Sequence, residues 1–166
     1  SGVRVAHERR RGQRGPRVRA RCGIAFAEEQ PRGAPFRRQA QQGDSLGERL
    51  VHATAESFEQ SAKRVVVIGT DSPWLSAESI EAAFEALKHK DIVIGPAEDG
   101  GYYLIGLRRE LPGVFQNIAW STGSVYRKTL ENAKRLSLSV EALAMGYDVD
   151  TKDDLDRFLS GQGRAN

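Results

Sequence analysis

The 166-residue sequence lacks the features that mark secreted, membrane-spanning and zinc-binding proteins. Cys22 is its one cysteine, so no disulfide can form within the chain, and no Cys/His cluster has the spacing of a zinc site. No run approaches the ~20 apolar residues that cross a bilayer, and no segment has the pattern of a secretory signal. We therefore expect a cytoplasmic protein that does not enter membranes.

Positive charge is concentrated at the N-terminus. Residues 1–38 contain eleven arginines against three glutamates, a net charge of +8, so a total of +3 leaves −5 for residues 39–166. A basic arm can bind nucleic acid by neutralising phosphates. Residues 4–21, however, contain glycines, no aromatic residue and little apolar periodicity. We therefore favour a poorly ordered segment over residues 1–22 and do not expect nucleic-acid binding.

Helix and strand patterns alternate from residue 23 onward. Ser45 and Glu48 match a capping box before a helix that extends to about residue 61, and Ser76 can cap a second helix. Further helices are predicted over 123–136 and after residue 151. Short apolar runs predict strands at 23–27, 65–70, 92–95 and 102–107, the last two being close enough to be antiparallel neighbours. The pattern indicates one α/β domain over residues 23–160 and a tail at 161–166.

Asp71 stands at the end of the most apolar short run in the chain. Residues 65–68 are β-branched without alternation, which predicts a strand covered on both faces. Ligands in open α/β sheets gather at the carboxyl ends of strands, so an aspartate there can hold a divalent cation or a sugar hydroxyl. Asp71 also fits a turn or an N-cap before the next helix. This segment alone does not decide between the two interpretations.

Three further segments carry residue types with chemical uses. Asp99-Gly-Gly101 suits a loop that approaches a ligand, but a tight turn needs the same glycines and is the better-supported interpretation from composition. Trp120-Ser-Thr122 offers a stacking surface and hydroxyls, although Thr122 also suits a helix N-cap. Asp148 and Asp150 would face the same way in extended backbone. Each segment therefore has both a functional and a structural interpretation.

Five segments, in their order along the chain, resemble a single family. They are Gln42–Arg49, Ile68–Leu75, Gly95–Gly106, Trp120–Thr122 and Asp148–Thr151, and the run Gly-Pro-Ala-Glu-Asp-Gly-Gly-Tyr-Tyr is the most specific. They resemble the DUF2064 family of GT-A-type glycosyltransferase-like proteins, also called selenium- or arsenosugar-associated transferase 1. The wider superfamily includes molybdenum-cofactor and 2-phospholactate guanylyltransferases. The resemblance covers about residues 23–160 and implies a Rossmann-like GT-A fold, three-layer α/β/α with a mostly parallel sheet.

The resemblance also implies an activity and a site. It implies sugar transfer from a nucleotide-sugar donor to a small-molecule acceptor with Mg²⁺ or Mn²⁺, or nucleotidyl transfer from a nucleoside triphosphate. The metal ligands would be Asp71, Asp148 and Asp150, and Asp99 would orient or deprotonate the acceptor. The implied substrate-binding residues are Gly69, Thr70, Ser72, Pro73, Gly100, Gly101, Tyr102, Trp120, Ser121 and Thr122.

The N-terminus departs from the family pattern. Family members begin with an apolar strand and a Gly-containing loop with a Lys-Thr-Arg-Leu-like run, which cradles the nucleotide. Ser1 to Arg21 show no strand signal. We therefore expect the first strand to be missing or altered, and a remnant domain that binds no donor is a further interpretation. A missing strand would expose a sheet edge and apolar surface, which favours a homodimer or aggregation.

Overall fold

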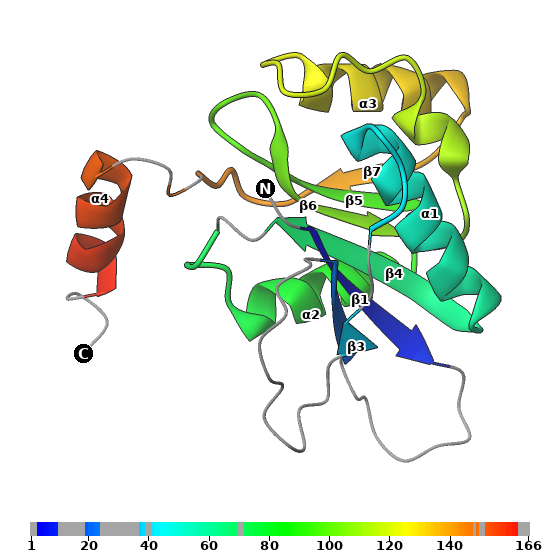
Figure 1. Cartoon of the computed structure of the whole chain (residues 1–166), viewed down its shortest axis with the longest axis horizontal. Helices are drawn as coiled ribbons and strands as arrows, with labels where there is room; N and C mark the ends of the chain where they lie inside the picture. Colours follow the sequence, from blue (N-terminus) through cyan, green and yellow to red (C-terminus); the bar gives the residue numbers. More distant parts are fainter. Residues whose placement is uncertain are drawn as a thin grey trace.

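The computed structural model describes residues 3–9, 19–23, 37–38, 41–69, 72–147, 149 and 152–162. Within these residues the chain forms one mixed sheet with helices on both faces (Figure 1). The strands are β1 (Val3–Arg9), β2 (Arg19–Gly23), β3 (Arg37–Arg38), β4 (Ala62–Gly69), β5 (Ile92–Pro96), β6 (Tyr102–Leu107) and β7 (Val140–Ala142). Their order across the sheet is β3-β2-β1-β4-β6-β5-β7. No helix among the described residues has the length and apolar character needed to cross a bilayer.

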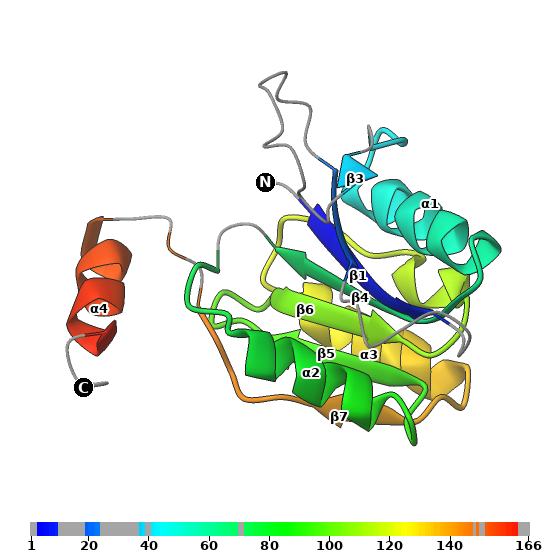
Figure 2. The same cartoon turned by 90° about the horizontal axis from the view of Figure 1, so that it is seen from below.

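Two apolar cores lie on opposite faces of the sheet. One face carries α1 (Leu46–Glu59), α3 (Val125–Arg135) and the 3₁₀ helix η1 (Pro112–Phe115), whereas α2 (Ala77–Ala86) covers the other (Figure 2). Strand β4 contributes to both cores, because Val65 and Val67 belong to the first and Val66 to the second. All three valines are at most 3% exposed. The predicted three-layer α/β/α arrangement is confirmed in the described part of the chain.

The prediction of a mostly parallel sheet is wrong. Four of the six neighbouring strand pairs in the described sheet are antiparallel, and β2–β3 and β5–β7 are the parallel ones. Two of the antiparallel pairs come from β1, which lies between β2 and β4, and the other two from β6, which returns from β5 through the short turn 97–101 and lies between β4 and β5. A parallel pair needs a crossover of a dozen or more residues, which this turn cannot provide. The predicted antiparallel pairing of the two closely joined strands is confirmed.

The N-terminal part of the chain differs from the sequence-based expectation. Strand β1 and the start of β2 lie within residues 1–21, where the sequence shows no strand signal, and β1 runs antiparallel along β4 from Val3–Gly69 to His7–Val65. Whether the first strand of the family pattern is missing or altered stays a prediction. Strand pairing uses backbone groups that an Arg-rich segment also supplies, and the edge of the buried strand β4 requires a partner. The predicted strand at 23–27 lies outside the described residues beyond Gly23.

Local capping signals place the helices of the domain. In α1 the Ser45 hydroxyl accepts a hydrogen bond from the Glu48 N–H, and the Glu48 carboxylate accepts one from the Ser45 N–H, each at 3.2 Å. This is the predicted capping box. The Ser76 hydroxyl caps α2 by accepting from the Ser79 N–H at 3.3 Å. The last helix, α4 (Lys152–Gln162), follows residue 151 as predicted and stands apart from the sheet (Figure 1).

Candidate functional site

The predicted site residues that the structure describes gather at one end of the sheet. Strands β4, β5 and β7 end there, and β6 and α3 begin there, so the connecting loops lie side by side (Figure 2). The loops span residues 72–76, 97–101, 120–124 and 143–147. Thr70, Asp71, Asp148 and Asp150 lie outside the described residues, so their predicted roles stay predictions.

The loop between β5 and β6 is a tight turn. The Ala97 N–H donates to the Gly101 carbonyl at 3.1 Å, and the Gly100 N–H donates to the Ala97 carbonyl at 3.0 Å. Gly100 has φ +86°, a left-handed conformation that favours glycine. The exposed Asp99 carboxylate accepts a hydrogen bond from the Gly101 N–H at 2.8 Å. These contacts support the turn interpretation of the glycines, and the catalytic role of Asp99 stays a prediction.

This turn is fixed to the start of α3. A Cβ on Gly100 would overlap the Gly123 carbonyl, and the Tyr126 N–H donates to the Gly100 carbonyl at 2.9 Å. The turn is also fixed on its other side, where the Glu98 N–H donates to the Gly146 carbonyl at 3.0 Å. Backbone contacts therefore hold three of the four loops in one unit.

The segment Trp120–Thr122 has a larger structural role than its composition indicated. Trp120 packs on Gly47 of α1 and lies 6.5 Å from Phe115 between ring centroids. Thr122 is not the N-cap of α3, because the cap is Ser124, and the Thr122 hydroxyl donates to the Ala119 carbonyl at 2.7 Å. Ser121 has φ +61°, a sparsely populated conformation that is often found at functional sites. The N-cap prediction for Thr122 is thus wrong by two residues.

An aromatic cluster that we did not predict from sequence lies at this end of the sheet. Trp74, in the loop after β4, meets Tyr103 of β6 edge-on at 4.7 Å and stacks on Tyr147 at 5.6 Å between ring centroids. Its indole N–H donates to the Tyr147 carbonyl at 2.5 Å. The Tyr103 hydroxyl donates to the Ala144 carbonyl at 2.9 Å. The one local signal of this cluster is a tryptophan directly after the strand, because the tyrosines that it contacts are far away in sequence.

The two adjacent tyrosines of β6 point to opposite cores. Tyr102 packs against the α1–α3 core and Tyr103 against the α2 core. Burial raises the pKa of the Tyr102 phenol, and the Thr129 side chain offsets this only in part. The Tyr102 hydroxyl makes no hydrogen bond of standard geometry with any described residue. Burial also raises the pKa of Tyr103, so both phenols are neutral at pH 7.

The remaining predicted substrate-binding residues flank the aromatic cluster. Gly69 ends β4, and a Cβ there would lie 3.8 Å from the Tyr103 carbonyl, an ordinary contact. Ser72 is 7% exposed, whereas Pro73 is exposed. Among the described residues, no group of three His, Cys, Asp or Glu side chains could hold a metal ion. A metal site with three or more such ligands in this region would therefore need at least one ligand from outside the described residues, and the predicted ligands Asp71, Asp148 and Asp150 all lie there.

Comparison with known proteins identifies the family. A family model described as "Uncharacterized protein conserved in bacteria (DUF2064)" matches residues 15–122, well over half of the chain. The chain belongs to the DUF2064 family. Its resemblance in sequence to DUF2064 is therefore confirmed.

A crystal structure shares the fold of this DUF2064 chain. It comes from Desulfovibrio desulfuricans G20 and is provisionally described as a nucleotide-diphospho-sugar transferase. The TM-score is 0.76 at 40% sequence identity, with 81% of this chain and 59% of that chain covered. The α/β fold of the described residues thus resembles a nucleotide-diphospho-sugar transferase fold.

Two curated relatives are guanylyltransferases. A 2-phospho-L-lactate guanylyltransferase of Methanocaldococcus jannaschii is 28% identical over 118 residues, 68% of this chain and 50% of the relative. A phosphoenolpyruvate guanylyltransferase of Sphaerobacter thermophilus is 30% identical over 123 residues, 71% of this chain and 57% of the relative. The DUF2064 chain thus spans only about half to three fifths of the proteins that it matches.

Proposed function

We propose that this DUF2064 protein is a metal-dependent transferase that moves a sugar from a nucleotide-sugar donor to a small-molecule acceptor. The likeness to a provisionally described nucleotide-diphospho-sugar transferase supports the donor class. The observation that carries the proposal is the contact between Trp74 and Tyr147. It joins the loop that follows Asp71 to the segment that precedes Asp148.

Chain connectivity explains why this contact favours a shared carboxylate site. Consecutive Cα atoms are about 3.8 Å apart, so Asp148 is one such step beyond Tyr147 and Asp71 three steps before Trp74. Carboxylate oxygens are the ligands that Mg²⁺ and Mn²⁺ prefer, so Asp71, Asp148 and Asp150 form a suitable donor set. A bound divalent ion would neutralise the charge that develops on the leaving diphosphate.

The protein's own groups would then act on the acceptor. An acceptor hydroxyl would form a bond to the sugar carbon while the bond from that carbon to the diphosphate breaks, and the nucleoside diphosphate leaves with the electron pair. Asp99 would accept the hydroxyl proton, because its carboxylate is exposed at the tip of a rigid turn between the loops. The turn would hold it in place through Gly100 and Gly101.

A second candidate function is guanylyl transfer, which the two curated relatives favour. In that reaction an acceptor phosphate oxygen attacks the α-phosphate of GTP and pyrophosphate leaves. The same carboxylates could serve either reaction, since both have a pyrophosphate-containing donor. The released product separates them, because sugar transfer yields a nucleoside diphosphate and guanylyl transfer yields pyrophosphate.

Calorimetry with Mn²⁺ and a panel of UDP-sugars, GDP-sugars and GTP tests the proposal. We expect one donor class to bind in the presence of Mn²⁺, and Asp71→Asn to weaken that binding at least tenfold, which corresponds to about 1.4 kcal/mol. Asp91→Asn, at the opposite end of β5, is the matched control and should bind like the wild type. Donor binding that is unaffected by Asp71→Asn would refute the metal assignment. Absence of binding to every donor would favour the remnant domain.

A further inference from the structure

Trp74 connects two parts of the chain that the sheet itself keeps apart. The loop 72–76 follows β4, whereas Gly146 pairs with Ala97 at the end of β5. Strand β6 lies between β4 and β5, and neighbouring strands are about 4.8 Å apart. The ends of β4 and β5 are therefore roughly 10 Å apart, and the segment beyond β5 is one spacing farther.

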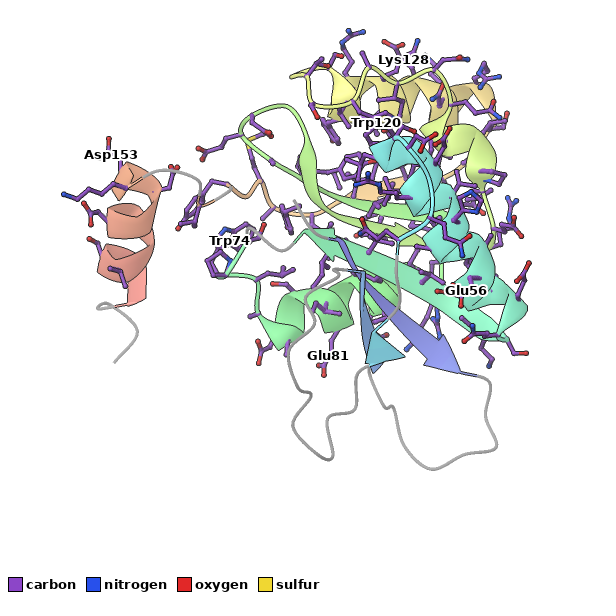
Figure 3. All side chains as sticks on the ribbon, in the orientation of Figure 1. Glu56, Trp74, Glu81, Trp120, Lys128 and Asp153 are labelled. Atoms are coloured by element: carbon purple, nitrogen blue, oxygen red, sulfur yellow. The ribbon has the colours of Figure 1, made fainter. Side chains whose placement is uncertain are left out.

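That separation matters for a shared cation. Metal–oxygen distances are about 2.0–2.6 Å, so carboxylate oxygens that bind one ion lie within roughly 5 Å of each other. Loops from β4 and from the far side of β5 can meet only if they lean over β6. The Trp74 indole, which is labelled in Figure 3, spans this interval. It contacts Tyr103 of β6 and stacks on Tyr147 beyond β5.

The support beneath the indole is rigid. Gly146 leaves the space that the Trp74 ring occupies, since a Cβ there would overlap the ring. The Gly146 N–H donates to the Pro96 carbonyl at 2.8 Å, and the Gly146 carbonyl accepts from the Glu98 N–H at 3.0 Å. Trp74 thus binds to a segment that is itself held to β5.

We infer that Trp74 is a positioning residue that holds the loop 72–76, which follows Asp71, against the segment 143–147, which precedes Asp148. This inference rests on the proposed function, in which the carboxylates of Asp71 and Asp148 would share one cation. The indole N–H is the one hydrogen-bond donor of the side chain, and it donates to the Tyr147 carbonyl 73 residues away. Because Trp74 is half-buried at the rim of the α2 core, its packing and its hydrogen bond can be separated experimentally.

The variant Trp74→Phe keeps an aromatic ring and removes the N–H donor. We measure the Kd for Mn²⁺ at a saturating concentration of whichever donor of the UDP-sugar, GDP-sugar and GTP panel binds the wild type. We expect this Kd to rise about fivefold, the order expected for one lost hydrogen bond. The control Asp91→Asn weakens the hydrogen bonds between Asp91 and Ser139 at the opposite end of β5. It should leave the Kd for Mn²⁺ unchanged. A rise of equal size in both variants would overturn the inference, because it would reflect general loss of stability.

A second measurement needs no ligand. Hydrogen exchange of the unliganded protein should be faster in Trp74→Phe than in the wild type for peptides that cover residues 72–76 and 143–147, and unchanged for β4. Unchanged exchange together with unchanged Mn²⁺ affinity would overturn the inference while leaving the proposed function intact. A wild-type protein that binds neither Mn²⁺ nor any nucleotide would overturn both, even if the exchange differs.

Discussion

Gly47 and Trp120 pack so closely that a Cβ on Gly47 would lie 2.5 Å from the indole nitrogen of Trp120. Gly47 is in the first turn of α1 and Trp120 is in the loop before α3, so this contact joins two helices on the same face of the sheet (Figure 3). Position 47 therefore has no room for a side chain, because the neighbouring Trp120 ring is large and lies against Phe115.

Gly47→Ala should therefore destabilise the protein despite the better helix propensity of alanine. We expect the overlap with Trp120 to lower the free energy of unfolding by about 1–3 kcal/mol, against a propensity gain of about 1 kcal/mol. Urea denaturation measures the difference. In the background Trp120→Leu the same substitution should cost less, since the ring is gone. Equal costs in the two backgrounds would show that the ring does not limit position 47.

Tyr103→Phe should destabilise the protein and Tyr102→Phe should not. The buried Tyr102 hydroxyl makes no hydrogen bond of standard geometry with a described residue, so its removal should leave the free energy of unfolding unchanged or raise it by up to about 1 kcal/mol. The Tyr103 hydroxyl donates to the Ala144 carbonyl, so its removal should cost about 1 kcal/mol. Thermal unfolding of the two variants and the wild type at one pH measures these differences in stability. A larger loss for Tyr102→Phe would contradict the structural basis of this prediction.

Gly100→Ala should be more damaging than Gly101→Ala. Alanine at 100 would adopt a left-handed φ of +86° and overlap the Gly123 carbonyl, so we expect a loss of about 1–3 kcal/mol from the backbone alone. A Cβ on Gly101 would lie 3.1 Å from the Asp99 carboxylate, a side-chain end that can move. Chemical denaturation of both variants gives the comparison, and a reversed order would contradict the turn geometry.

Asp91 should make stability depend on pH in the acid range. Its carboxylate accepts from the Ser139 N–H at 3.0 Å and from the Ser139 hydroxyl at 2.8 Å, and it pairs with the exposed Arg109. The backbone hydrogen bond from Ser139 is the main cause that lowers the pKa of Asp91, followed by the hydroxyl bond. The folded protein thus favours the ionised form more than the unfolded chain does.

The sign of the pH effect follows from this lowered pKa. The stabilisation is complete above the unfolded pKa of about 4 and is lost as pH falls through the lower folded pKa. Asp91→Asn should therefore cost about 1 kcal/mol at pH 7, since solvent screens the Arg109 pair, and progressively less below pH 4. Denaturation at pH 7, 5 and 3 measures the trend. Glu131→Gln, in an exposed ion-pair network, should give a smaller effect.

Local structure in this protein could be predicted closely from sequence. The capping residues Ser45 and Ser76 mark the helix starts, and β6 has the bounds that its apolar run predicts. Strand β7 was not predicted, because its three residues, Val-Glu-Ala, have no apolar period and gain their strand conformation from pairing with β5. An element can therefore be predicted from local sequence where neighbouring residues supply the contacts that stabilise it.

The arrangement of elements depended on contacts between distant residues. No local pattern states that β6 lies between β4 and β5, or that an arginine-containing strand covers the edge of β4. The same holds for the site, where Trp74 and Tyr147 are 73 residues apart. The sequence shows which loops carry residues with chemical uses. Which of these loops meet depends on how the strands are ordered in the sheet.

The position of β6 also has a consequence for how the chain folds. β5 and β6 are joined by five residues, so their hairpin closes a short loop at small entropic cost. Pairing of β4 with β6 instead connects Ile68 with Leu104 and encloses all of α2. We therefore expect the hairpin to form before β4 pairs with β6, so that the free edge of β6 serves as the template on which β4 docks.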